Sequence, residues 1–437
     1  MKILLVQPSS EQAIPVDSAA SAPLWPCILS RLTSQHHDVD FIQTSFEKIT
    51  EERIRGYDLV GISVWTHTSK QAYEIGDMCK RLNVKCVMGG IHPFVMPNEA
   101  IKHCDSVVLG EAEYVWQSIV RDAERNKLQR FYRCDLAKPV DIPSPDFSIV
   151  RKYKYAVENV IETTRGCPFN CDFCSATLYS GNTYRYKPVE KITEEIEAWK
   201  NPKSVAFFTD VNVISNFEKA KELFKAITPY NLTWWGDASV NVANDEELLK
   251  LASESGCAYL VIGFESISKE SLTVMNKVQN LRSDFKHVVK KLHDYNIDVI
   301  GSFIFGSDAD TKDVFKEICD FVHDADIDLP AFSILTPYPG TRIYKRLKQE
   351  GRILTEDWSL YTRTNVVFQP KKMTTEELIE GYISAWEETY SFPRSFGRSL
   401  SRWRGLRQQL LTSAFNFHSR KKARLLRDWH DRKEAER

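Results

Sequence analysis

Short apolar runs alternate with amphipathic helical stretches twice along this chain, and this alternation limits the possible fold more than any other feature. The runs of the first block are 2–7, 57–64, 84–88 and 106–109. Apolar strands separated by helices are typical of a parallel sheet with helices on both faces. We therefore expect an α/β fold that begins with a doubly wound, Rossmann-like domain over residues 1–135.

A second alternating block follows a proline-rich segment, 136–155, which we expect to be a linker. The apolar runs of this block are 157–161, 205–208, 232–235, 260–264, 299–305 and 332–335. Six strand–helix repeats are too few for a closed eightfold barrel, so they predict a partial, TIM-like (β/α)6 barrel over 156–345. The strand pattern then fades, and we expect residues 346–437 to be mainly α-helical.

Composition and charge exclude several classes of protein. Hydrophobic residues make up 43% and charged residues 27%, which is typical of soluble globular chains. The formal net charge of -1 gives no general case for nucleic acid as a partner. No apolar run approaches the roughly 18 residues that span a bilayer, and the first run is too short for a signal peptide. A cytoplasmic location is the expectation.

Three of the ten cysteines are crowded into eight residues. Cys167, Cys171 and Cys174 have the spacing C-x3-C-x2-C, directly after the first strand of the second block. Three thiolates in a tight loop can hold three irons of a cubane cluster and leave the fourth iron open for chemistry. The alternatives are buried thiols or a zinc site, which needs a fourth ligand, for example His92 or Cys257. The seven scattered cysteines are expected to be small core residues.

Small and polar residues follow the strands of the first block, where parallel sheets bind their ligands. Paired glycines at such an edge let the backbone approach a bulky ligand. The candidate cofactor-binding residues of this edge are Ser63, Thr66, Gly89, Gly90, His92, Gly110 and Glu111.

The cysteine motif, with Phe173 before its last cysteine, resembles the signature of radical S-adenosylmethionine (SAM) enzymes. The resemblance implies a [4Fe-4S] cluster on Cys167, Cys171 and Cys174, whose open iron binds the amino and carboxylate groups of SAM. One electron from the cluster would then cleave SAM to methionine and a 5'-deoxyadenosyl radical. These three cysteines are accordingly both the metal ligands and the expected catalytic residues.

The same resemblance assigns further SAM contacts to the ends of later strands. The usual Gly-Gly-Glu after the second strand is absent, so Asp210 or backbone carbonyls would bind the methionyl amino group. Glu265 after the fourth strand would bind the ribose hydroxyls, or else be a surface salt-bridge carboxylate. The fifth strand, which contains Ile304, would flank the adenine.

Segments 60–63, 88–93 and 108–113 resemble the cobalamin-binding domain that precedes the barrel in one subgroup of these enzymes. The chain lacks the Asp-x-His-x-x-Gly loop that would offer a histidine to cobalt. The resemblance therefore implies cobalamin bound base-off, without a protein histidine ligand. Trp65 could cover its lower face or be an ordinary aromatic residue. A corrin-free remnant of the same fold is the alternative for this domain.

The subgroup resemblance implies a methyltransferase that passes a methyl group from methylcobalamin to an unactivated carbon, or less readily phosphorus, of a small-molecule or lipid-like substrate. Flavodoxin or ferredoxin would supply electrons. A cyclase or rearrangement enzyme with the same cofactors is the first alternative. A methylthiotransferase acting on tRNA and a non-enzymatic cluster-binding or corrinoid-binding protein are further ones. Tyr338, Trp358 and Tyr361 are candidate substrate-lining residues.

The C-terminal segment 394–427 contains ten Arg and Lys residues and no Asp or Glu. An apolar stripe at helical spacing runs through it: Leu400, Trp403, Leu406, Leu410, Ala414 and Phe417. Two hypotheses fit this pattern. The helix packs on the barrel with a solvated basic face, or it makes peripheral contact with the anionic inner membrane surface.

Overall fold

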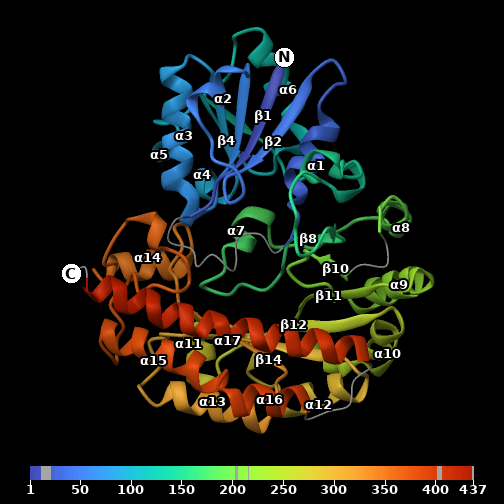
Figure 1. The fold of residues 1–437 in the computed structure, drawn as a ribbon, viewed down its shortest axis with the longest axis vertical. Helices are drawn as coiled ribbons and strands as arrows, with labels where there is room; N and C mark the ends of the chain where they lie inside the picture. Colours follow the sequence, from blue (N-terminus) through green and yellow to red (C-terminus); the bar gives the residue numbers. More distant parts are fainter. Residues whose placement is uncertain (11–20, 202–204, 215, 401–405, 436–437) are drawn as a thin grey trace.

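The first domain is built on a six-stranded sheet in which all neighbours are parallel, in the order β2-β1-β3-β4-β5-β6 (Figure 1). The computed structural model describes residues 1–10, 21–201, 205–214, 216–400 and 406–435. The strands are β1 Lys2–Gln7, β2 Asp38–Gln43, β3 Leu59–Ser63, β4 Lys85–Gly89, β5 Ser106–Leu109 and β6 Phe131–Arg133. The apolar runs predicted β1, β3, β4 and β5 but missed the two edge strands. β2 carries two aspartates and β6 has three residues, so neither forms a continuous apolar run.

Helices cover both faces of this sheet. The helices of one face are α1 Leu24–Leu32 and α6 Trp116–Glu124, and those of the other are α2 Glu51–Arg55, α3 Ser69–Arg81 and α5 Pro97–Ala100. Because side chains alternate along a strand, Ile3 and Leu5 enter the first core while Leu4 and Val6 enter the second. The predicted doubly wound domain is confirmed.

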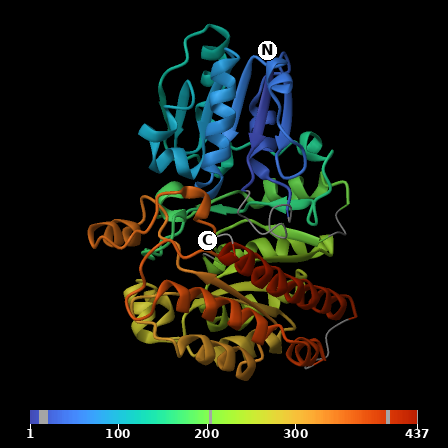
Figure 2. The same ribbon diagram turned by 60° about the vertical axis from the view of Figure 1, so that its left-hand side comes forward.

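The second sheet is also parallel throughout, in the order β14-β13-β12-β11-β10-β7. Its strands are β7 Asn159–Ile161, β10 Val205–Phe208, β11 Thr233–Ala238, β12 Cys257–Glu265, β13 Asp298–Phe305 and β14 Leu329–Ile334. The intervening helices are α8 Val189–Glu197, α9 Phe217–Ile227, α10 Glu246–Glu254, α11 Lys269–Val274, α12 Phe285–Asp294 and α13 Val314–Asp324. This arrangement confirms the predicted partial barrel, which lies below the first domain in Figures 1 and 2.

The inner face of the partial barrel is less tightly filled than its outer face. On β13, Phe303 and Phe305 are fully buried among outer residues, whereas the alternate residues Ser302 and Ile304 are half-buried. β10 and β11 show the same alternation. The interior therefore leaves inward-facing side chains partly accessible.

The loop with the three cysteines leaves the barrel after β7. It is framed by a two-stranded antiparallel hairpin, β8 Thr164–Arg165 and β9 Arg185–Tyr186, and contains α7 Ala176–Ser180. In Figure 1, α7 lies between the two sheets, which brings this loop next to the carboxyl edge of the first sheet.

The expected linker 136–155 packs against the first domain. Tyr155 donates through its hydroxyl to Gln43 Oε1 (2.8 Å), and Tyr153 donates to Glu47 Oε2 (2.9 Å). Both tyrosine rings belong to one core of the first sheet. The C-terminal end of the segment is thus bound to the domain that precedes it.

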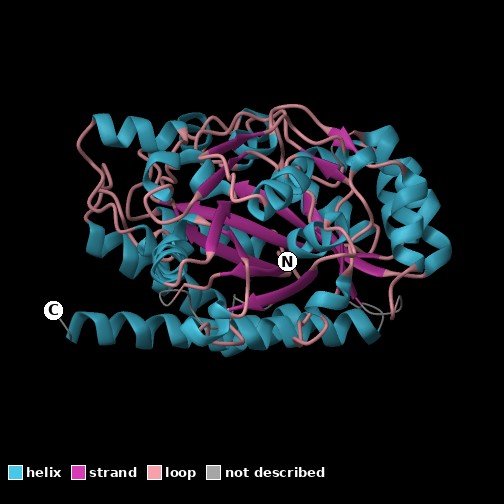
Figure 3. Ribbon diagram, turned by 90° about the horizontal axis from the view of Figure 1, so that it is seen from above, coloured by secondary structure: helices cyan, strands magenta, loops and turns pink. Residues whose placement is uncertain are grey.

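The C-terminal segment is mainly helical, as predicted, with α14 Arg342–Gln349, α15 Thr375–Thr389, α16 Phe392–Leu400 and α17 Leu406–Ala435. α17 runs along one side of the molecule (Figure 3) and crosses the amino ends of β12 and β13, where Gln408 Nε2 donates to the Ala258 carbonyl (3.0 Å). Within the described residues no helix is long and apolar enough to span a bilayer. In the predicted stripe, Leu410 and Phe417 face outward, and the side chains of Leu400, Trp403 and Leu406 lie outside the described part.

Candidate active site

The three predicted cluster ligands lie in one tight loop. Its entry requires glycine, because Gly166 has φ +86° and a Cβ atom there would lie 2.1 Å from the Thr183 carbonyl oxygen. Within the loop, the Cys167 amide donates to the Gly181 carbonyl (3.2 Å) and the Cys174 amide donates to the Cys171 carbonyl (3.3 Å). The backbone therefore fixes where the three thiols emerge.

The thiols of this loop are free, and burial raises the pKa of Cys171 and of Cys174. Cys167 and Cys171 are buried and Cys174 is half-buried. Burial raises the pKa of Cys171, while the Lys277 ammonium and a hydrogen bond from Gln279 Nε2 to its Sγ (3.6 Å) act in the opposite direction. A cation and a donor beside a thiol favour the deprotonated form that metal binding requires.

The loop fits a cluster better than a single ion. No group of three His, Cys, Asp or Glu in the described chain is arranged to hold one metal ion. A cubane binds each thiolate on a different iron, so its cysteine ligands need not converge on one point. Three free thiols in one loop are the donor set that such a cluster needs.

Asp210 binds the segment that leads into this loop. Its buried carboxylate accepts hydrogen bonds from the Thr163 amide (3.0 Å) and hydroxyl (2.9 Å), from the Thr164 hydroxyl (2.7 Å) and from the Thr164 amide. Burial raises the pKa of Asp210 to about 6. These contacts give Asp210 a structural task just before the cysteines, and its contact with the methionyl amino group stays a prediction.

Glu265 ends β12 in a strained backbone conformation and is paired with a lysine that the sequence did not reveal. Its φ is +64°, in the left-handed region that non-glycine residues rarely occupy. Lys277 Nζ lies 2.8 Å from Glu265 Oε1, and both side chains are largely buried. The segment that carries Lys277 lies against the cysteine loop, since the Asp172 amide donates to the Met275 carbonyl (3.0 Å) and Gln279 Nε2 lies 3.6 Å from Cys171 Sγ.

Other inward-facing positions complete the barrel side of the site. Ile304 is half-buried on the inner face of β13, and Phe173 is partly buried against the barrel core. Asp237, on β11, was not predicted. Burial and the nearby carboxylates of Asp210 and Glu265 raise the pKa of Asp237 to about 7.

The carboxyl edge of the first sheet presents a backbone surface that suits a bulky ligand. Ser63, Gly89 and Gly90 are half-buried, and Thr66 and Gly110 are buried. A Cβ atom on Gly90, whose φ is +99°, would lie 2.9 Å from the backbone of Val64. The features of this edge that fit a corrin are a close backbone approach and, in the loop after Ser63, the 55% exposed indole of Trp65.

His92 is part of a buried network rather than of this edge. Its side chain is fully buried, and its Nε2 lies 3.0 Å from the Tyr73 hydroxyl and 3.4 Å from Glu99 Oε1. Glu99 also accepts from Trp358 Nε1 (3.0 Å), which connects the first domain with the C-terminal segment. His92 Nδ1 has no hydrogen-bond partner among the described residues, and the contact between His92 and a cofactor stays a prediction.

Glu111 is likewise held by protein groups. Its buried carboxylate forms a bidentate pair with Arg185 (2.7 and 2.9 Å), lies 3.2 Å from Arg165 Nη1 and accepts from the Ala137 amide (2.7 Å). Arg165 and Arg185 belong to the hairpin that frames the cysteine loop. The structure thus shows Glu111 as a clamp between the two domains, and its predicted contact with a cofactor finds no support in this geometry.

The candidate substrate residues form a small core of their own. Tyr361 is fully buried and donates to the Thr355 carbonyl (2.7 Å), Trp358 is 7% exposed, and Tyr338 packs against them. The side chains of Tyr361 and Trp358 are packed in this core, and their contact with a substrate stays a prediction.

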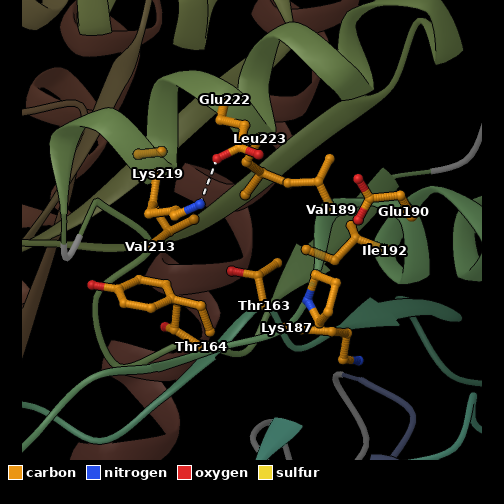
Figure 4. Close-up of a pocket in the computed structure, with 13 residues that line it drawn as sticks. Thr163, Thr164, Lys187, Val189, Glu190, Ile192, Val213, Lys219, Glu222 and Leu223 are labelled. Carbon is orange, nitrogen blue, oxygen red and sulfur yellow. Dashed lines mark hydrogen bonds and ion pairs between the residues drawn. The ribbon is translucent and has the colours of Figure 1, made fainter. Parts of the chain in front are cut away.

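A pocket of about 330 Å³ lies beside the cysteine loop, between the β8–β9 hairpin, α8 and α9. Figure 4 shows Thr163 and Thr164 on one of its sides and the Lys219–Glu222 ion pair (2.8 Å) on another. No predicted cofactor-binding residue is among its lining residues. The pocket adjoins the site without forming part of it.

Four residues of the site escaped sequence reasoning: Lys277, Asp237, Arg165 and Arg185. Lys277 lies 12 residues after Glu265, with no short motif between them. Arg165 offered a usable signal, because it directly precedes Gly166 and Cys167. The other three can be recognised only from the folded structure, in which segments that are distant in sequence lie side by side.

Comparisons with known proteins agree with this geometry. Residues 21–120 match the B12 binding domain, residues 161–322 match the radical SAM superfamily, and residues 341–430 match a domain of unknown function. The bacteriochlorophyllide d C-12(1)-methyltransferase of Chlorobaculum tepidum is 35% identical over 89% of this chain and 87% of its own length. The bacteriochlorophyllide d C-8(2)-methyltransferase of the same organism is 30% identical over 92% and 93%.

Similarity extends to a cyclase and to a solved structure. The anaerobic magnesium-protoporphyrin IX monomethyl ester cyclase of Cereibacter sphaeroides is 24% identical over 89% of this chain and 70% of its own. The radical SAM methyltransferase TsrM of Kitasatospora setae, solved with cobalamin and a [4Fe-4S] cluster, shares the fold with a TM-score of 0.71 at 15% identity, over 97% of this chain and 99% of its own. The sequence relatives cover both domains in the same order. The chain therefore belongs to the cobalamin-dependent radical SAM methyltransferase family.

Proposed function

We propose that this protein transfers a methyl group to an unactivated carbon of a small, largely apolar molecule, with a [4Fe-4S] cluster, SAM and base-off cobalamin as cofactors. The two relatives above that are at least 30% identical are named for the methylation of bacteriochlorophyllides. Neither of these names mentions transfer of a methyl group to phosphorus.

One observation carries the proposal: the clamp of Glu111 with Arg165 and Arg185 holds the cysteine loop against the carboxyl edge of the first sheet. Bound in these two places, the cluster with SAM would supply a 5'-deoxyadenosyl radical, and the corrinoid would supply the methyl group. Both must reach one substrate atom, so the two cofactor sites must face each other. A buried bidentate ion pair fixes such a spacing more firmly than a flexible linker.

The side chains have separate tasks in this proposal. Cys167, Cys171 and Cys174 hold the cluster, with Gln279 and Lys277 beside Cys171. Glu265 binds the ribose hydroxyls, and residues around Ile304 and Phe173 flank the adenine and the cluster loop. Ser63, Thr66, Gly89, Gly90 and Gly110 form the backbone edge on which the corrin lies.

We also propose the division of the chain into a cobalamin-binding domain over 1–135, a connecting segment over 136–155, a radical SAM barrel over 156–345 and a helical segment over 346–437. Flavodoxin or ferredoxin is the proposed source of the electron. The second candidate function is a cyclase or rearrangement enzyme with the same cofactors, which the similarity to the cyclase of Cereibacter sphaeroides favours.

The test uses anaerobically purified, reconstituted protein. We expect about four irons per chain, bound corrinoid and, with dithionite and SAM, both 5'-deoxyadenosine and S-adenosylhomocysteine by mass spectrometry. Deoxyadenosine without S-adenosylhomocysteine would favour the cyclase. Replacing Cys167, Cys171 and Cys174 with Ala should abolish iron binding and deoxyadenosine, whereas the control Cys319→Ala should keep both. Retention of iron and turnover in the triple variant would refute the proposal.

A further inference from the structure

The first half of α17 packs on the barrel largely through polar side chains, and the second half packs through Ala423 and Leu426. Thr412 is fully buried and bonds to Asp298 Oδ2 (2.8 Å) and to the Tyr259 hydroxyl (3.0 Å). Asn416, one turn further, is 1% exposed and donates to the Asp328 carbonyl (3.4 Å). An ordinary surface helix buries its apolar stripe, whereas at Thr412 and Asn416 this helix buries polar side chains.

The opposite side of α17 and the adjoining α16 expose large apolar side chains. Phe417 is 72% exposed, Leu410 62% and Phe392 60%, and they are the three most exposed large apolar residues of the described chain. Phe396 is 56% exposed and stacks on Phe392, with ring centroids 5.9 Å apart. Such side chains rarely gather on a surface that faces only water.

Two contacts set these helices in antiparallel register. The Arg420 guanidinium lies 5.2 Å from the centroid of the Phe392 ring, and Arg398 Nη2 donates to Asn416 Oδ1 (3.0 Å). This register places Phe396 level with Phe417. We treat four exposed apolar side chains of the two helices as one surface, here called the aromatic face: Phe392, Phe396, Leu410 and Phe417.

Basic side chains continue the aromatic face. Lys421 and Arg424 are exposed and follow Phe417 at helical spacings of four and three. Arg427 and Arg394, in contrast, are paired with glutamates of α15. Residues 394–427 contain no acidic side chain, and exposed Asp428 follows one turn after Arg424, so the positive charge next to the aromatics comes from Lys421 and Arg424.

We propose that the aromatic face is a docking surface for an anionic phospholipid bilayer. Aromatic side chains insert at the headgroup level, and adjacent Lys and Arg side chains are attracted by anionic lipids. A protein interface would be depleted of lysine at its core, whereas this surface joins its aromatics directly to cations. The proposal is independent of the reaction that the protein catalyses.

Vesicle co-sedimentation of the full-length, reconstituted protein tests this surface. We expect binding to vesicles of phosphatidylcholine with phosphatidylglycerol, weaker binding to phosphatidylcholine alone, and weaker binding at high salt. The variant Phe392→Ser/Phe396→Ser/Phe417→Ser should bind at least about tenfold less, since insertion of apolar area is lost. Leu354→Ser, which changes another exposed apolar side chain (52%), should bind like the parent protein.

A second variant changes charge alone. Lys421→Glu/Arg424→Glu leaves the aromatics in place and should lose binding to phosphatidylglycerol vesicles, with unchanged circular dichroism and iron content. Absence of vesicle binding in the parent protein, or an equal loss in Leu354→Ser, would overturn the proposal. So would sedimentation equilibrium showing that the aromatic face joins two copies of the chain and that the triple variant separates them.

Discussion

Removing the charge of Glu111 should weaken both the fold and the cofactor site. Glu111→Gln keeps the shape of the side chain but leaves Arg185, 13% exposed, without its only carboxylate among the described residues. Arg185 then retains the Ala137 and Ser180 carbonyls as acceptors. Arg165 is less affected, because Glu113 (2.7 Å) and Glu162 (2.8 Å) still neutralise it.

The size of the effect follows from this difference. Loss of one partner from a buried ion pair costs about 3–5 kcal/mol, because the remaining charge stays in a medium of low polarity. Because two carbonyls still accept hydrogen bonds from Arg185, we expect Glu111→Gln to lower the free energy of unfolding by about 3 kcal/mol, the lower end of this range. The exposed pair of Glu51 with Arg81 offers a matched control, and Glu51→Gln should cost less than about 1 kcal/mol.

Urea unfolding followed by circular dichroism measures these free energies. The double variant Glu111→Gln/Arg185→Met should recover part of the loss, with a coupling of about 1–3 kcal/mol, since it removes the buried charge as well. Iron content and deoxyadenosine formation should fall in Glu111→Gln, because the hairpin around the cysteine loop loses its anchor. Unchanged stability in Glu111→Gln, or strictly additive effects in the double variant, would refute this account of the clamp.

Three other changes have defined outcomes. Asp210→Ala removes the acceptor of several buried donors at Thr163 and Thr164, which should cost about 3 kcal/mol and lower the iron content on reconstitution. The pKa of Asp237 is raised from 3.8 to about 7, so ionised Asp237 destabilises the fold increasingly as the pH rises from 3.8 through 7. Asp237→Asn should therefore stabilise the cofactor-free protein by up to ~4 kcal/mol at pH 8 and by less at pH 5. A gain in stability that does not grow with pH would contradict this expectation. Lys277→Met should destabilise by about 3 kcal/mol in thermal and urea unfolding, and a second change, Glu265→Gln, should restore much of it because the unpaired carboxylate is then gone.

The architecture was largely readable from the sequence, because an apolar strand buried on both faces leaves a continuous signal. The six barrel strands and four of the six strands of the first sheet came from such runs. The edge strands β2 (Asp38–Gln43) and β6 (Phe131–Arg133) were missed. The two aspartates of β2 interrupt its apolar run, and β6 has only three residues.

The candidate site divides in the same way. The spacing of Cys167, Cys171 and Cys174 is local, so the sequence alone indicated a cluster loop. The two arginine partners of Glu111 are more than 50 residues away in the chain, and no local pattern indicates them. The sequence could offer Glu111 only as a residue at the end of a strand.

What the sequence by itself determined is the order of the two α/β domains and the chemistry of the cysteine loop, since both depend on neighbouring residues. Only the tertiary structure decided which polar groups are already occupied. It assigned Asp210 to Thr163 and Thr164 and His92 to Tyr73 and Glu99. It also turned Leu410 and Phe417 of the predicted apolar stripe outward. The reason is physical: a buried charge or donor must find a partner in space, and that partner is chosen by the packing of distant segments.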